Sequence, residues 1–197
     1  MVYAIFALIA LPMLAVVIGF AFYNRLIALR NAYKNAFAQI DVQLKRRHDL
    51  IPNIVETAKG YIQHERGTLE VVTAARGAAI NAAQAAAAAP GETAVMTQLS
   101  NAESNLTGAL GRLIAIAEAY PDLKANQVML QLMEELTTTE NRVGLARQAY
   151  NDSVMFYNTA IQKVPANIVA NWYHFTPAEF FQLDNSTDRQ LPPVSFS

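Results

Sequence analysis

The sequence predicts an all-α protein in which a single N-terminal transmembrane helix is followed by an antiparallel four-helix bundle with coiled-coil packing. Three observations lead to this prediction. The first 24 residues carry no charge, apolar residues recur at helical spacing through the rest of the chain, and no alternating strand pattern or Asn-Gly hairpin signal stands out. A length of 197 residues is enough for one anchored domain with a buried core.

The first element is the apolar run over residues 2–23, which as a helix of about 22 residues would span about 33 Å and cross the hydrocarbon core of a bilayer. A cleaved signal peptide has a basic start and a shorter apolar core, so a retained anchor is favoured over a signal peptide. The next charged residues, Arg25, Arg30 and Lys34, are all basic. Because basic residues close to a span tend to stay in the cytoplasm, we expect the N-terminus outside and the domain cytoplasmic.

The first domain helix should continue the anchor, because apolar residues over 26–44 follow a 3-4-4-3-4 spacing. Around Pro52 two interpretations are open: Asp49 caps a new helix with Pro52 in its first turn, or Pro52 kinks one long helix. We favour the break, which makes residues 50–89 the second helix. This helix ends in an alanine run that Pro90-Gly91 terminates.

The third and fourth helices are expected over residues 92–119 and 124–163. Tyr120-Pro121-Asp122 separates them, and Val164-Pro165 closes the fourth. Long amphipathic helices joined by short loops favour an antiparallel bundle. An even number of helices then returns the chain toward the membrane.

The chain therefore divides into an anchor (1–24), a helical bundle (25–166), an aromatic segment (167–183) and a flexible tail (184–197). The aromatic segment has three candidate roles: it caps the open end of the bundle, lies on the bilayer surface, or packs between subunits. Capping is favoured. The aromatic side chains concerned are Trp172, Tyr173, Phe175, Phe180 and Phe181.

Charged residues on a core-facing stripe need partners, because an isolated buried charge costs several kcal/mol. Glu140 shares a stripe with Leu136 and Val143, and we expect Arg47 to be its partner. The favoured interpretation is a register-fixing ion pair; the alternatives are a ligand or partner site and a solvated surface. The candidate ionic network comprises Arg47, Glu56, Glu135, Glu140 and Arg142.

Composition and motifs argue against several functional classes. The net charge of −1 argues against a nucleic-acid binder, and the absence of cysteine excludes disulfides and thiol chemistry. His48, His64 and His174 lie too far apart for a metal motif, and there is no nucleophile elbow, phosphate loop or dinucleotide fingerprint. We therefore expect no enzymatic activity, cofactor or metal; an unrecognised hydrolase that uses the charged residues is the least favoured alternative.

Several segments resemble the LemA family of bacterial membrane proteins. They include residues 37–47 (FAQIDVQLKRR), 49–53 (DLIPN), 117–126 (AEAYPDLKAN) and 146–152 (ARQAYND), followed by Tyr157-Asn158. The resemblance covers essentially the whole chain. It implies an N-out single-pass anchor in the inner membrane, a cytoplasmic four-helix bundle and no established enzymatic activity. It also implies an association with membrane zinc metalloproteases of the HtpX type in some bacteria, and with magnetosome formation in one branch.

These observations together predict a membrane-anchored, non-enzymatic scaffold or adaptor that self-associates. An anchor concentrates copies in two dimensions, and a face of small residues lets helices approach closely. That face comprises Ala78, Ala82, Ala85 and Ala89. The alternative, which rests on the resemblance alone, is an accessory subunit that presents proteins to a membrane metalloprotease of the HtpX type. The expected partners are membrane lipid, further copies of the chain and, in the alternative, the protease, with no nucleic acid.

Overall fold

The computed structural model describes residues 2–182 and contains no β-strand within this range. The elements are α1 (Val2–Lys59), the 3-10 helix η1 (Gln63–Glu65), α2 (Arg66–Ala88), α3 (Thr93–Ala119), α4 (Pro121–Lys124), α5 (Gln127–Gln162) and α6 (Ala166–Trp172). The prediction of an all-α chain is confirmed. The predicted tail, residues 184–197, lies outside the described residues.

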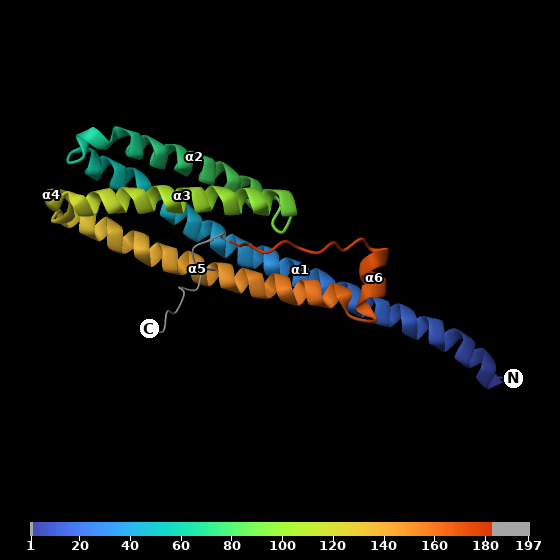
Figure 1. Ribbon diagram of the computed structural model, residues 1–197. Helices are drawn as coiled ribbons and strands as arrows, with labels where there is room; N and C mark the ends of the chain where they lie inside the picture. Colours follow the sequence, from blue (N-terminus) through green and yellow to red (C-terminus); the bar gives the residue numbers. More distant parts are fainter. Residues whose placement is uncertain (1, 183–197) are drawn as a thin grey trace, which may run out of the picture.

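The long helix α1 is the spine of the molecule. Its N-terminal part extends beyond the other helices, while α2, α3 and α5 lie along its distal part (Figure 1). Side chains in the extending part, such as Leu11, Val17 and Phe20, are exposed in the monomer. By length and composition α1 could cross a membrane, and only 6% of its apolar window is buried. The predicted N-terminal membrane helix is therefore present as a candidate span.

The predicted helix break at Pro52 is wrong. α1 continues through Pro52, and the chain reverses only at Gly60-Tyr61-Ile62. Proline lacks the N–H that would donate to the carbonyl of His48, four residues earlier. In the structure Arg76 Nε of α2 donates to this carbonyl instead, at 2.6 Å. A side chain distant in sequence replaces the missing backbone donor, so the helix persists.

The other helix ends lie close to their predicted positions. α2 ends before Pro90-Gly91, α3 ends before Pro121, and α5 ends just before Val164-Pro165. The predicted second helix over residues 50–89 is in fact three elements: the last turns of α1, the short η1 and the whole of α2. Turn residues therefore marked three of the reversals correctly, whereas the reversal at Gly60 was missed.

Buried residues recur every seven positions on the four long helices. The repeats are Leu26, Tyr33, Ile40, Arg47 and Ile54 on α1; Val72, Ala79 and Ala86 on α2; Met96, Glu103, Leu110 and Ala117 on α3; and Met129, Leu136, Val143, Tyr150 and Tyr157 on α5. A seven-residue repeat keeps one stripe of a helix facing its neighbours over many turns. Two charged residues, Arg47 and Glu103, thus lie within stripes that are otherwise almost entirely apolar.

The helix α1 packs against both α5 and α2, and α2 packs against α3. At the distal end of α1 the Tyr61 hydroxyl accepts a hydrogen bond from Asn126, the residue that caps α5, at 2.9 Å. Nearer the apolar part, Tyr33 and Phe37 contact Tyr150, which lies further along α5. These contacts show that α1 and α5 run in opposite directions.

The alanine run of α2 forms the inner face of that helix. Four of its alanines are buried: Ala79, Ala82, Ala83 and Ala86. Ala82 was predicted to lie on a small-residue face for self-association, yet it is only 1% exposed within the monomer. The predicted face is therefore not free as a whole, because α2 uses part of it to pack inside the chain.

Candidate functional site

A buried polar cluster joins α1 to α3. Arg47, His48 and Glu103 are each no more than 3% exposed. Arg47 forms an ion pair with Glu103, and His48 Nε2 lies 2.9 Å from Glu103 Oε1. Each carboxylate oxygen therefore has its own partner, which offsets the cost of removing the charge from water.

Of the predicted ionic network, only Arg47 is buried. The exposed members are Glu56, Glu135, Glu140 and Arg142, and Glu56 pairs with Lys59 on the surface of α1 at 2.8 Å. The α1–α5 contacts place Glu140 level with Arg47 along the helices, but Thr139 takes the inward position there. The predicted Arg47–Glu140 pair is therefore wrong, since the buried stripe of α5 passes through the neighbouring residue.

Glu103 is the partner that the sequence analysis missed. It lies four residues after Leu99 and three before Leu106, so it falls on the same face of the third helix as these leucines. A glutamate in the centre of such a stripe is a signal for a buried ion pair, and the same reasoning that singled out Glu140 applies to it more strongly.

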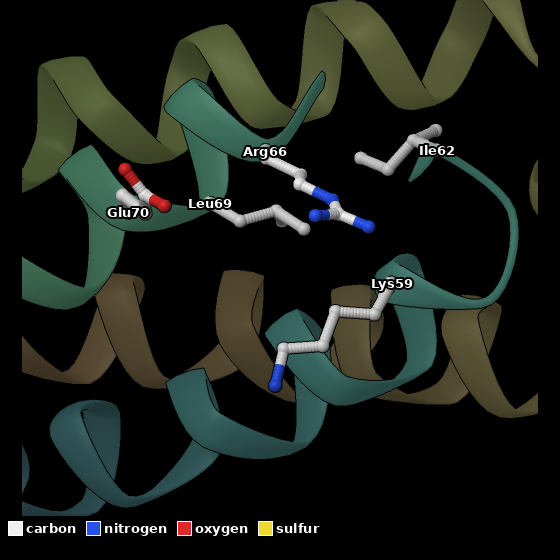
Figure 2. Close-up of a pocket in the computed structure, with 5 residues that line it drawn as sticks. All are labelled: Lys59, Ile62, Arg66, Leu69 and Glu70. Carbon is white, nitrogen blue, oxygen red and sulfur yellow. The ribbon is translucent and has the colours of Figure 1, made fainter. Parts of the chain in front are cut away.

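A hollow of about 490 Å³ lies at the distal end of the molecule, between the end of α1 and the start of α2 (Figure 2). Figure 2 shows the Arg66 guanidinium directed into this space, near Ile62, while the Lys59 ammonium points away from it. Lys59 Nζ instead contacts Glu56 at 2.8 Å. The two cations of this hollow do not converge on one point, so they do not form a shared anion site.

The C-terminal strap, residues 175–182, is an extended segment that runs back along the helices from α6 (Figure 1). Two asparagines of α5, seven residues apart, hold its backbone. Asn158 donates to the Ala178 carbonyl and accepts from the Ala178 N–H, both at 2.9 Å. Asn151 holds Phe181 in the same way, at 3.1 and 2.9 Å. Each side-chain amide thus satisfies one donor and one acceptor of the strap, as a neighbouring strand would.

Two tyrosines of α5 reinforce this attachment. The Tyr157 hydroxyl donates to the Thr176 carbonyl at 2.9 Å, and the Tyr150 hydroxyl donates to the Glu179 carbonyl at 2.8 Å. Burial, together with the neighbouring Tyr33, raises the pKa of Tyr157 to about 12. Burial also raises the pKa of Tyr150. Both hydroxyls therefore remain protonated donors at neutral pH.

Gly91, in the turn between α2 and α3, contacts the other side of the strap. Its carbonyl accepts a hydrogen bond from the Glu179 N–H at 2.8 Å. Its φ is +87°, and a Cβ at this position would lie 3.0 Å from Ala178 and 3.1 Å from the Tyr33 ring. Only glycine combines this backbone conformation with so close an approach.

The structure divides the predicted aromatic segment into two parts. Phe181 is fully buried, and Phe175 and Phe180 pack half-buried against the core, so these three rings are directed toward the protein interior. Trp172 and Tyr173 are 79% and 55% exposed. The predicted capping role stays a prediction for the phenylalanines, while Trp172 and Tyr173 remain available for contact with lipid or another chain.

These exposed rings lie where the apolar part of α1 meets its first cations. The Tyr173 ring centroid lies 4.7 Å from that of Tyr23, which in turn lies 5.8 Å from that of Phe175. The Arg30 guanidinium stacks over Phe175, 5.2 Å from the ring centroid. We call this set, Tyr23, Arg30, Trp172, Tyr173 and Phe175, the basal junction.

A family model described as the LemA family matches residues 36–196, which include nearly all of the folded body. The chain belongs to the LemA family. Protein LemA of Metamycoplasma hominis is 26% identical to this LemA-family chain over 159 residues, an alignment that covers 81% of this chain and 68% of the relative.

Other relatives of this LemA-family chain are named as magnetosome proteins. MamQ 2 of Paramagnetospirillum magneticum is 25% identical over 175 residues, and MamQ of Magnetospirillum gryphiswaldense is 26% identical over 174 residues. Both alignments cover 81% of this chain but only 64% of the relative. The chain therefore spans somewhat less than two thirds of the length of these relatives.

The segments by which the chain resembles the LemA family include the residues that hold the strap. Tyr150 and Asn151 lie in the 146–152 segment, and Tyr157-Asn158 follows it. The sequence signal for their role is the repetition of a Tyr-Asn pair after seven residues, which places both pairs on one face of α5. What the pairs hold became clear only from the structure.

Proposed function

We propose that this LemA-family chain is a membrane-anchored, non-enzymatic scaffold or adaptor that self-associates at the bacterial inner membrane. In this proposal an antiparallel four-helix bundle stands on the cytoplasmic side and the N-terminus lies outside. The observation that carries the proposal is the continuity of α1, which is both the exposed apolar helix and the spine of the folded body. An unbroken helix transmits orientation, so the body has a fixed position relative to the bilayer, as a scaffold requires.

The use of the buried polar groups supports a structural role for the body. Glu103 is paired with Arg47 and His48. Arg76 donates a hydrogen bond to the His48 carbonyl, which has no backbone donor because residue 52 is proline. The buried tyrosine hydroxyls hold the strap. Side chains that could serve as acids or bases thus stabilise the arrangement of the helices.

Exposed apolar residues on α5 support self-association. Leu145 is 68% exposed and Phe156 is 60% exposed, and their separation of eleven residues, about three helical turns, puts them on one side of the helix. Copies confined to a membrane meet at high effective concentration, so a modest apolar contact is sufficient for association. This surface takes the place of the alanine face that is partly buried in the monomer.

Membrane topology can be tested with single cysteines, because the natural chain contains none. We expect Tyr3→Cys to react with a membrane-impermeant maleimide in intact cells, and Arg112→Cys to react only after lysis. Both residues are exposed in the monomer, so a difference in labelling reports the side of the membrane. The reverse labelling pattern would overturn the proposed topology, and equal labelling of both in intact cells would overturn the anchoring.

Self-association can be tested by oxidative crosslinking of Phe156→Cys in native membranes. We expect a covalent dimer for this variant and monomer for Asn105→Cys, an exposed position on α3. Monomer for both variants at ordinary expression would contradict self-association. Co-purification with a membrane metalloprotease after mild solubilisation, without further copies of the chain, would favour the accessory-subunit alternative.

A further inference from the structure

We propose that the basal junction binds one anionic phospholipid, with an acyl chain in the groove between α1 and α6 and the phosphate at Arg30 and Lys34. This inference rests on the proposed membrane anchoring and deepens it by naming the lipid class and the residues that recognise it. Three features of the structure support this inference: an apolar groove, a cationic cavity and the stripe of α1 that connects them.

The groove lies between the apolar part of α1 and the helix α6, and its volume is about 420 Å³. Every residue that lines it is apolar, aromatic or glycine. Gly19 forms part of its floor, and an added Cβ there would meet nothing within 4 Å, so the space above it is open. Trp172 and Tyr173 form part of the opposite side. An open apolar groove with Trp and Tyr at its rim has the composition of a site at the membrane interface.

The cationic cavity lies beside the strap and has a volume of about 550 Å³. Arg30, Lys34 and His174 line it, together with the turn that leads into α3; among the residues that the structure describes, Glu92 is the one acid that lines it. Arg30 Nε is buried and has no hydrogen-bond partner within residues 2–182. A buried guanidinium donor without a partner is costly, and a phosphate oxygen is one of the acceptors that guanidinium geometry fits well.

One stripe of α1 passes from the groove to the cavity. Its members follow one another at helical spacing: Val16, Phe20, Tyr23, Arg30 and Lys34. Phe20 and Arg30 are ten residues apart, about 15 Å along the helix, which suits one lipid with its chain in the groove and its phosphate in the cavity. The contacts of Tyr23 with Tyr173 and of Arg30 with Phe175 make the surface continuous between them.

The charges favour an anionic headgroup over a zwitterionic one. Two permanent cations, Arg30 and Lys34, face one acid, Glu92, in the cavity. A choline or ethanolamine headgroup would bring its own cation close to the guanidinium, whereas a phosphatidylglycerol headgroup brings only the phosphate charge. Attraction to an anionic lipid contributes to binding for each cation near the surface.

The sole tryptophan of the chain, Trp172, lies in the groove and reports on its occupant. The full chain is reconstituted into phosphatidylcholine vesicles that contain a small, equal fraction of either phosphatidylglycerol or phosphatidylcholine with brominated acyl chains. We expect brominated phosphatidylglycerol to quench Trp172 at a lower mole fraction. Arg30→Gln with Lys34→Gln should weaken this preference by about fivefold for each cation removed. The matched control, Arg112→Gln with Lys124→Gln, removes two exposed cations of the body and should leave the preference unchanged.

A second variant tests the groove without changing charge. Gly19→Leu places a side chain over the open floor, so we expect it to reduce the quenching by brominated phosphatidylglycerol while circular dichroism stays unchanged. Equal quenching by both lipids, or a preference that survives the double Arg30 and Lys34 substitution, would overturn the lipid site. Loss of the preference on adding inorganic phosphate would assign the cavity to free phosphate and also overturn it, whereas persistence supports it. Absence of quenching by either lipid would instead overturn the proposed anchoring.

Discussion

The α1–α5 and α2–α3 interfaces use opposite kinds of side chain. Between α1 and α5, the rings of Tyr33 and Phe37 meet those of Tyr150 and Tyr157 at centroid distances of 5.1 to 6.4 Å. Between α2 and α3, one helix contributes four buried alanines and the other contributes mainly leucine and alanine. The first interface gains stability from large buried areas and the second from close approach. The α1–α5 pair should therefore be sensitive to lost volume, and the α2–α3 pair to added volume.

Polar side chains join these two pairs of helices. Arg47 and His48 of α1 contact Glu103 of α3, and Arg76 of α2 contacts the backbone of α1. Because these contacts are directional, they fix how the aromatic pair and the alanine-rich pair are placed along each other. Removing one of them should cost more than removing a comparable charge from the surface.

The largest effect is expected for Glu103→Ala, which leaves the buried Arg47 without a counter-charge. Removing one partner of a buried ion pair costs about 3–5 kcal/mol of unfolding free energy. Urea denaturation of the full chain in detergent micelles, followed by circular dichroism, measures this loss. Glu140→Ala is the matched control, since Glu140 is exposed and should change stability by less than about 0.5 kcal/mol. Equal losses for both variants would show that the cluster does not join the helix pairs.

The second effect concerns the proline in α1. Arg76→Met leaves the His48 carbonyl without a donor, and the loss of a hydrogen bond from a charged group costs about 1.5–3 kcal/mol. In a Pro52→Ala background the backbone N–H returns, so we expect the same Arg76 substitution to cost clearly less. A double-mutant cycle of urea-unfolding free energies measures this coupling.

A coupling of zero between positions 52 and 76 would contradict this explanation of the unbroken helix. Arg112→Met, which removes an exposed arginine from α3, is the control. Its effect should be small and should not depend on Pro52.

The third effect tests the alanine-rich interface. Ala82→Leu adds three carbon atoms at a site that is 1% exposed, and such overpacking costs about 1–3 kcal/mol. Ala78→Leu places the same side chain on the exposed side of α2 and should leave the melting temperature nearly unchanged. If both variants melt at the same temperature as the parent chain, the close approach of α2 and α3 is not required for stability.

Most of the helix positions could be predicted from the sequence, because proline, glycine and the spacing of apolar residues act locally. It also placed Arg47 correctly in the core. It could not distinguish Glu140 from Thr139 as the inward residue of α5, since a stripe allows steps of three or four and only the neighbouring helix decides between them. It could not show that α1 survives Pro52, because the compensating donor, Arg76, is far away in the chain.

The position of the strap could not be predicted from local sequence patterns, for a different reason. An extended segment after the last helix has no periodicity of its own, and it is held by side chains of α5 and by the Gly91 carbonyl rather than by a neighbouring strand. The sequence showed an aromatic segment but not which rings turn inward. That division depends on Asn151 and Asn158, whose amides fix the strap at Phe181 and Ala178.

The smallest effect concerns the ionisation of Tyr157 and is absent at neutral pH. At alkaline pH it should distinguish the α1–α5 interface from the α2–α3 interface, because α2 and α3 contain no tyrosine. Burial raises the pKa of Tyr157 from 10 in its ordinary environment to about 12 in the fold. The folded state therefore favours the neutral phenol, and the resulting stability is complete below pH 10 and is lost as the pH rises toward 12. We expect urea-unfolding free energies to fall over this window, and to fall less steeply for Tyr157→Phe. Tyr61→Phe, at an exposed ring, should retain the parent slope; an equal slope for Tyr157→Phe would show that Tyr157 is not the source of the alkaline sensitivity.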